Sequence, residues 1–123
     1  MILVDTSIWI DHLRKGSPAL TELLHVDRVC THDFVIGELA CGNLQNRAEI
    51  LGLLQSLPKA PAVTEDEILF FIEQRRLMGQ GIGYIDAHLL AACVMQGVQL
   101  WSKDKRLKDI AEKNACGYVP EAH

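Results

Sequence analysis

The sequence predicts an α/β fold in which helices cover both faces of a central parallel sheet of four to five strands. Short apolar runs without polar alternation, beginning with residues 2–4, are typical of strands buried on both faces. Segments with helix start signals follow these runs, so strands and helices alternate along the chain. The 123 residues, of which 49% are hydrophobic, suffice for a sizeable core, and we expect one domain over residues 1–123.

The first half of the chain is expected to contain two strands and four helices. The strands are residues 2–4 and 28–31, and the helices are residues 8–13, 18–25, 34–41 and 47–57. Ser17 before Pro18 is a typical helix start, and Gly42 ends the third helix. Asn46 with Glu49 resembles a capping box for the fourth.

The second half is expected to add up to three strands and three helices. The strands are residues 62–63, 98–101 and 117–119, and the helices are residues 65–78, 85–96 and 105–115. Thr64 with Glu67 forms a second capping-box pattern, and Gly97 ends the following long helix. The glycine-containing segment 79–83 indicates a flexible loop, because a phosphate cradle needs a preceding strand and a different glycine spacing.

Composition bounds the class of protein. The four cysteines are scattered, which is neither a zinc pattern nor a disulfide framework, so we expect reduced thiols in the cytoplasm. Residues 82–101 have the length of a membrane span but contain Asp86, and we expect a helix and a strand there and no membrane association. The net charge of −4 does not exclude nucleic-acid binding, because local patches steer such binding.

Four acidic residues stand at unusual positions. Asp5 and Asp104 lie at or just beyond the ends of two apolar strands, whereas Glu38 and Asp86 interrupt long apolar stretches. Ligands of open α/β sheets bind outside the carboxyl ends of the strands. A helix cap, a helix dipole or an ion pair explains each acid singly as well as a site does. Jointly they predict a cluster of carboxylates on one rim of the sheet.

Such a cluster favours a bound cation. Two unit charges about 4 Å apart repel by roughly 4 kcal/mol at an effective dielectric constant of about 20, and this repulsion raises carboxyl pKa values. An all-oxygen site suits Mg²⁺ or Mn²⁺. These ions polarise phosphoryl oxygens and lower the pKa of a bound water, so the cluster predicts metal-assisted phosphodiester hydrolysis.

Hydroxyl groups stand next to two of the acids. Ser7, preceded by Thr6, is expected to orient Asp5, and Ser102 to orient Asp104 or a phosphate. Helix capping explains these hydroxyls equally well. Both interpretations stay open at the level of the sequence.

Basic residues surround the last acid: Lys103, Lys105 and Arg106. A solvated basic face is the usual explanation, but beside an acidic metal site these side chains would contact nucleic-acid phosphates. The few aromatic residues form no visible stacking platform for single strands. His88 is two residues from Asp86 and on another helix face, so we expect a structural histidine with satisfied hydrogen bonds.

Four motifs, taken together, resemble PIN domains. They are residues 4–9 (VDTSIW), 37–42 (GELACG), 85–92 (IDAHLLAA) and 100–104 (LWSKD). Their order and spacing resemble those of the family over essentially the whole chain, and the length and opening resemble VapC-type toxins of bacterial toxin–antitoxin pairs. The resemblance implies a three-layer α/β/α fold. It also implies that Asp5, Glu38, Asp86 and Asp104 coordinate Mg²⁺ or Mn²⁺ and an attacking water.

The resemblance implies partners as well. Members of the family cleave RNA, often at one site in a structured RNA, and are usually homodimers. A cognate VapB-like antitoxin inserts a segment into the active groove, and operator DNA is bound only through the antitoxin. Ser102 stands where the family commonly has Thr, and Lys105 and Arg106 follow Asp104 where many members have a further acid for a second metal position.

Functions of other classes stay open from the residues alone. An aspartate-dependent phosphatase would use Asp5 as nucleophile, but Ser7 occupies the position of its expected second acid. A receiver domain would need paired acids at the first strand, which are absent. A non-catalytic PIN-fold RNA-binding or scaffold domain would have no use for four mutually repelling acids, and metal dependence would distinguish it from a nuclease.

Overall fold

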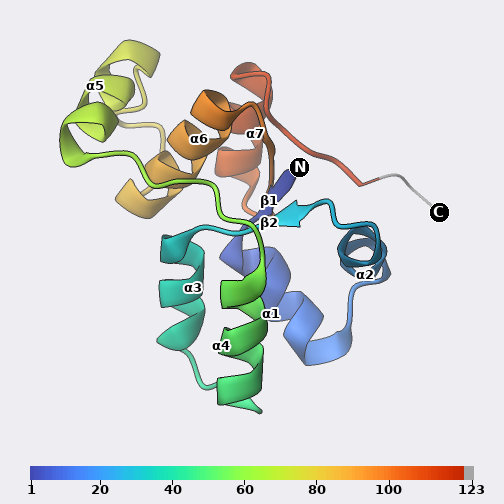
Figure 1. The fold of residues 1–123 in the computed structure, drawn as a ribbon. Helices are drawn as coiled ribbons and strands as arrows, with labels where there is room; N and C mark the ends of the chain where they lie inside the picture. Colours follow the sequence, from blue (N-terminus) through green and yellow to red (C-terminus); the bar gives the residue numbers. More distant parts are fainter. Residues whose placement is uncertain (121–123) are drawn as a thin grey trace.

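The computed structural model describes residues 1–120 and confirms the α/β class, with helices packed around a small parallel sheet (Figure 1). The strands are β1 (Ile2–Val4), β2 (Val29–Cys30) and β3 (Gln99–Trp101). The helices are α1 (Thr6–Lys15), α2 (Pro18–His25), α3 (Asp33–Ala40), α4 (Arg47–Ser56), α5 (Glu65–Arg75), α6 (Tyr84–Gln96) and α7 (Lys105–Lys113).

The sheet has the order β2-β1-β3, and both pairings are parallel. Single bridges extend it at both sides, between Thr31 and Lys59 and between Leu100 and Gly117. The described residues thus form three strands with a bridge beside each outer strand, where four to five strands are predicted. The strand predicted at residues 62–63 does not form; Lys59 pairs instead, in a segment bounded by Pro58 and Pro61.

The central strand β1 shows why the chain folds as layers. Ile2, Leu3 and Val4 are fully buried, so both faces of the strand are covered. Figure 1 shows α1, α3 and α4 gathered in one group and α5, α6 and α7 in another, with the strands between them. Because β1 and β3 are parallel neighbours, the residues that follow them emerge at the same edge of the sheet.

Several helix ends follow the predicted signals. Ser17 accepts a hydrogen bond from the Leu20 N–H at the start of α2. The Thr64 hydroxyl accepts from the Glu67 N–H and the Glu67 carboxylate accepts from the Thr64 N–H, so this capping box is confirmed. Gly97, with φ of 67°, ends α6 in the left-handed region that glycine adopts at low cost.

Other ends differ from the predictions. Asn46 makes no side-chain cap and has φ of 55°, so the predicted capping box of α4 is wrong: its backbone is left-handed, not the extended form that capping needs. Helix α5 ends three residues early because Arg76 has φ of 52°. Helix α7 ends before Ala115, which has φ of 58°. No helix within residues 1–120 is long and apolar enough to span a membrane.

Candidate active site

Three of the four acids lie at helix N-termini on the rim where β1 and β3 end. Asp5 is the N-cap of α1, Asp104 is the N-cap of α7, and Asp86 is the third residue of α6. The capping that the sequence offers as one explanation of Asp5 and Asp104 is therefore realised. The positive ends of three helix dipoles favour negative charge here and lower the cost of gathering carboxylates.

Asp5 is the most firmly held of these acids. It is buried, and its carboxylate accepts hydrogen bonds from the Thr6 N–H at 2.8 Å, the Ser7 hydroxyl at 3.1 Å and the Ser102 hydroxyl at 2.7 Å. A carboxylate offers about four acceptor positions. Three donors therefore fix its orientation and leave room for roughly one further ligand.

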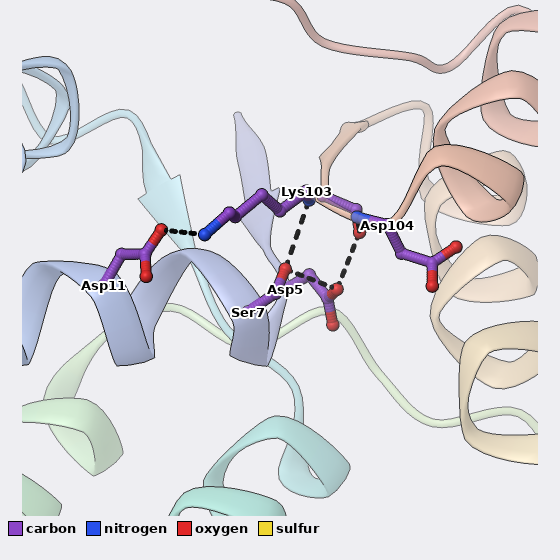
Figure 2. Close-up of polar contacts among 6 residues, drawn as sticks. Asp5, Ser7, Asp11, Lys103 and Asp104 are labelled. Atoms are coloured by element: carbon purple, nitrogen blue, oxygen red, sulfur yellow. Dashed lines mark hydrogen bonds and ion pairs between the residues drawn. The ribbon is translucent and has the colours of Figure 1, made fainter.

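The turn after β3 is tied to the start of α1 by the same serines (Figure 2). The Ser7 hydroxyl accepts from the Lys103 N–H at 3.1 Å, and the Ser102 hydroxyl accepts from the Asp104 N–H at 3.0 Å. The Ser102 hydroxyl thus donates to the Asp5 side chain and meets only the backbone of Asp104. Each serine holds the turn and a carboxylate at once.

Asp104 and Glu38 are both exposed. One Asp104 oxygen accepts from the Leu107 N–H at 3.0 Å, and Figure 2 shows its side chain directed away from Asp5. Glu38, near the end of α3, accepts from the Thr6 hydroxyl at 2.8 Å. Thr6 thereby connects α1 to α3, rather than supporting Asp5 with its side chain.

The pKa of the Asp86 carboxyl group depends on burial and on the charges of the other three acids. Burial raises the pKa of its carboxyl group above the ordinary value, and the negative charges of Asp5, Asp104 and Glu38 raise it further. A hydrogen bond from the Gly83 N–H at 3.4 Å opposes this shift. Negative charge from distant parts of the chain, residues 5 to 104, thus adds to this shift.

The donor set fits a hard divalent cation, because it consists of carboxylate oxygens whose mutual repulsion a cation would relieve. The carboxylates do not form a closed cage: in the described part of the chain, no three His, Cys, Asp or Glu side chains converge closely enough to hold an ion.

The three basic residues differ in their surroundings. The Lys103 ammonium group forms an ion pair with Asp11 on α1 at 2.6 Å. Arg106 lies over Gly81, where a Cβ atom would come within 2.6 Å of the arginine Cδ. Gly81 has φ of 82° and lacks a side chain, which allows this approach. Lys105 is exposed.

A row of rings that the sequence reasoning missed connects α6 to α3. The His88 ring lies edge-on to Tyr84, with ring centroids 4.6 Å apart, and to Phe34, at 4.8 Å; His32 continues the row 5.1 Å beyond Phe34. The Nδ1 atom of buried His88 has no hydrogen-bond partner among the described residues. The prediction that the hydrogen bonds of His88 are satisfied is therefore wrong. The spacing of four residues between Tyr84 and His88 was the available signal.

Comparisons with known proteins identify the family of this chain. The family model described as PIN domain matches residues 2–113. Proteins named Ribonuclease VapC32, from two strains of Mycobacterium tuberculosis, are 49% identical over 122 residues, which is 98% of this chain and 98% of theirs. The crystal structure of PAE2754 from Pyrobaculum aerophilum has a TM-score of 0.56 at 15% identity and covers 93% of this chain and 94% of that one, which shows a shared fold. The chain therefore belongs to the PIN domain family and, within it, to the VapC-type ribonucleases.

Proposed function

We propose that this protein is a Mg²⁺- or Mn²⁺-dependent endoribonuclease, one PIN domain over residues 1–123, that acts as the toxin of a toxin–antitoxin pair in the cytoplasm. The observation that supports the proposal is the placement of three of the four acids, Asp5, Asp86 and Asp104, at the N-termini of three helices. The relatives named as ribonucleases support RNA as the substrate.

Asp5, Glu38, Asp86 and Asp104 would hold the cation, which supplies phosphoryl polarisation and a water of lowered pKa when bound. The chain's own residues supply orientation. Ser7 and Ser102 fix the Asp5 carboxylate, and Thr6 fixes Glu38 from the neighbouring helix. Arg106, and Lys105 beside it, would contact phosphates of the bound RNA; Lys103 could join them only by leaving Asp11.

The test is RNA cleavage by the partner-free protein with Mg²⁺, with Mn²⁺ and with chelator. We expect cleavage only with a cation, and loss of cleavage in Asp5→Asn. Asp109→Asn, which makes the same change at an exposed position on α7, is the matched control and should cut at the wild-type rate. Cleavage in chelator, or by Asp5→Asn, would refute the assigned site; RNA binding without cleavage of any RNA would favour a PIN-fold binding or scaffold domain.

We further propose that a cognate VapB-like antitoxin covers the site. A groove of about 690 Å³ runs beside Glu38 between α1, α3 and the segment leading into α4. Ile10 and Leu39 lie along it, so an amphipathic peptide would find apolar and charged contacts together. Three experiments test the proposed antitoxin. The neighbouring gene product should copurify with this protein and inhibit its cleavage of RNA, and operator DNA should be bound only when that product is present. We also propose a homodimer, as the family resemblance implies, and sedimentation of the protein without its partner tests it.

A further inference from the structure

We propose that Tyr84 forms a nucleobase-binding subsite beside the four acids, on which a base of the RNA stacks next to the cleaved phosphate. The inference deepens the proposed function and rests on it in one respect, since the ligand is taken to be a single-stranded RNA segment. It adds an aromatic platform that the sequence does not reveal.

The position of Tyr84 places it on the rim. It is the first residue of α6, two residues before Asp86, and 51% of its surface is exposed. Helix α6 leads into β3 and packs against it, and Asp104 follows β3 as the N-cap of α7. The Tyr84 ring contacts His88, and His88 packs on Phe34, which lies one helical turn before Glu38 on α3. A base on the Tyr84 ring would therefore belong to a nucleotide near this edge of the molecule.

The ring of Tyr84 is held in place from one side. His88, one helical turn along α6, lies edge-on to it at an interplanar angle of 82°. His88 is itself buried and packs edge-on against Phe34 of α3 at 77°. A supported aromatic ring loses little conformational freedom when a ligand covers its open part, which favours affinity.

A cationic group lies against the segment that leads into α6. Arg106 is two residues after Asp104, and its side chain lies over Gly81, three residues before Tyr84. These residues thus offer a guanidinium group for a phosphate and an aromatic face for a base. Asp104 is two residues before Arg106, and Asp86 is two residues after Tyr84. This combination of stacking ring and backbone-binding cation is how proteins hold single-stranded nucleic acid.

The surroundings favour a nucleotide over an apolar protein face. A covering protein surface that packed only on the Tyr84 ring would remove water from Asp86 and Arg106 without replacing their hydrogen bonds, which is costly. RNA with bound cations satisfies both groups while stacking on the ring. Large exposed apolar side chains such as Phe70 and Leu69 belong to α5 instead.

Binding is measured first, in the Asp5→Asn background so that the RNA is not cut. The probe is a fluorescently labelled single-stranded RNA of mixed sequence, titrated with each variant and followed by anisotropy. Tyr84→Ala should weaken binding about 5- to 150-fold, the range expected for loss of one stacked base. Tyr84→Phe keeps the ring and should bind within about twofold of its parent. Phe70→Ala removes an exposed ring elsewhere and should change nothing.

Cleavage is measured second, with Asp5 intact. Tyr84→Ala should raise KM by a similar factor, and Tyr84→Phe should restore it. In the cleaved RNA, replacing nucleotides one at a time with abasic sites should reveal one position at which the wild type and Tyr84→Ala become equal. A fall in kcat alone, with unchanged KM and unchanged RNA affinity, would mean that Tyr84 only supports α6 and would overturn the subsite.

Three further results bear on the subsite. Equal RNA affinity of Tyr84→Ala and its parent overturns it, as does an equal weakening by Phe70→Ala. Dissociation of a dimer in Tyr84→Ala with unchanged RNA affinity assigns the ring to a protein interface and also overturns it. If the wild type cuts no RNA with any cation, yet binding requires the ring at position 84, then the nuclease proposal fails and the nucleobase subsite stands.

Discussion

The two sides of the acidic rim are built by different means. On one side, the turns after β1 and β3 fix Asp5 with three hydrogen bonds, two of them from serines that also hold the turn of residues 102–104. On the other side, the structure gives Asp86 one long hydrogen bond, from Gly83, and its helix is braced against α3 by rings.

The difference separates two ways of preparing a carboxylate for a metal ion. Asp5 is oriented in advance by donors that also stabilise its charge. Asp86 is positioned mainly by the packing of its helix, and burial together with its acidic neighbours makes its charge unfavourable. We therefore expect substitutions on the two sides to have the same effect on activity and opposite effects on stability.

The largest expected effect comes from removing either acid. Asp5→Asn and Asp86→Asn should each lower the cleavage rate at least about a thousandfold, because the cation loses a ligand worth several kcal/mol in the transition state. Single-turnover cleavage in Mg²⁺ measures this loss. Retention of wild-type rates by either variant would remove that acid from the site.

Thermal melts of the same two variants in chelator sharpen the comparison. Asp86→Asn should raise Tm, by roughly 2 °C, because it removes a charge that burial and three neighbouring acids disfavour. Asp5→Asn should lower stability by about 1 kcal/mol, because its serine donors lose a charged acceptor. If both variants shift Tm in the same direction, the two sides are not built differently.

A smaller loss of activity is expected on the hydrogen-bonded side alone. Ser102→Ala should reduce cleavage about 10- to 100-fold, because Asp5 loses its shortest hydrogen bond and the Asp104 N–H loses its acceptor. Ser102→Thr keeps the oxygen and should stay close to the wild type. Cleavage rates are measured over a range of Mg²⁺ concentrations, and Ser102→Ala should need more Mg²⁺ than the wild type to reach half of its maximal rate. Equal rates for the alanine and threonine variants would contradict this prediction.

The row of rings between α6 and α3 should make the stability of the folded state depend on pH, through the buried histidine His32. Burial lowers the pKa of His32, and the His88 imidazole lowers it further. As the pH falls from 7, the unfolded chain binds this proton first, near the ordinary histidine pKa of about 6.5, so the folded state loses stability until the lower folded pKa is passed. His32→Asn keeps an acceptor for the Phe34 N–H but does not titrate.

We therefore expect a smaller loss of unfolding free energy between pH 7 and pH 5 in His32→Asn than in the wild type, measured by denaturant titration. The exposed His25→Asn is the matched control, and its loss should equal that of the wild type. If His32→Asn loses as much unfolding free energy as the wild type, then the protonation of His32 does not contribute to the loss of stability at low pH.

The sequence predicts the positions of the acids that follow strands better than it predicts the contacts around them. Acids after apolar strands are predictable, because parallel strands end at a common edge, and Asp5 and Asp104 lie where that rule puts them. The bond from Ser102 to Asp5 joins residues 97 positions apart, and no local pattern tells a serine which of two acids it will meet. Ring packing between α6 and α3 likewise depends on how two helices are docked.

The same limit applied to strand edges and charges. The strand predicted at residues 62–63 gave way to a bridge at Lys59, since the choice lies between neighbouring segments of similar propensity and tertiary packing decides it. The sequence places Lys103 beside Asp104, where either a solvated face or a phosphate contact would explain it. In the fold its ammonium group reaches Asp11, which is 92 positions away.

The Asp11–Lys103 pair gives the smallest expected effect and tests the phosphate role directly. The Lys103 and Asp11 side chains are 60% and 27% exposed, so the pair contributes little to stability. Asp11→Asn should free the ammonium group for RNA, tighten binding at low salt and steepen the slope of log affinity against log salt by about 0.7, the value for one added contact to a single strand. Lys103→Gln should leave the wild-type slope unchanged, because its ammonium group is engaged by Asp11 in the free protein. A flatter slope in Lys103→Gln would mean that RNA already displaces Asp11, and the pair would then be a contact that substrate binding breaks.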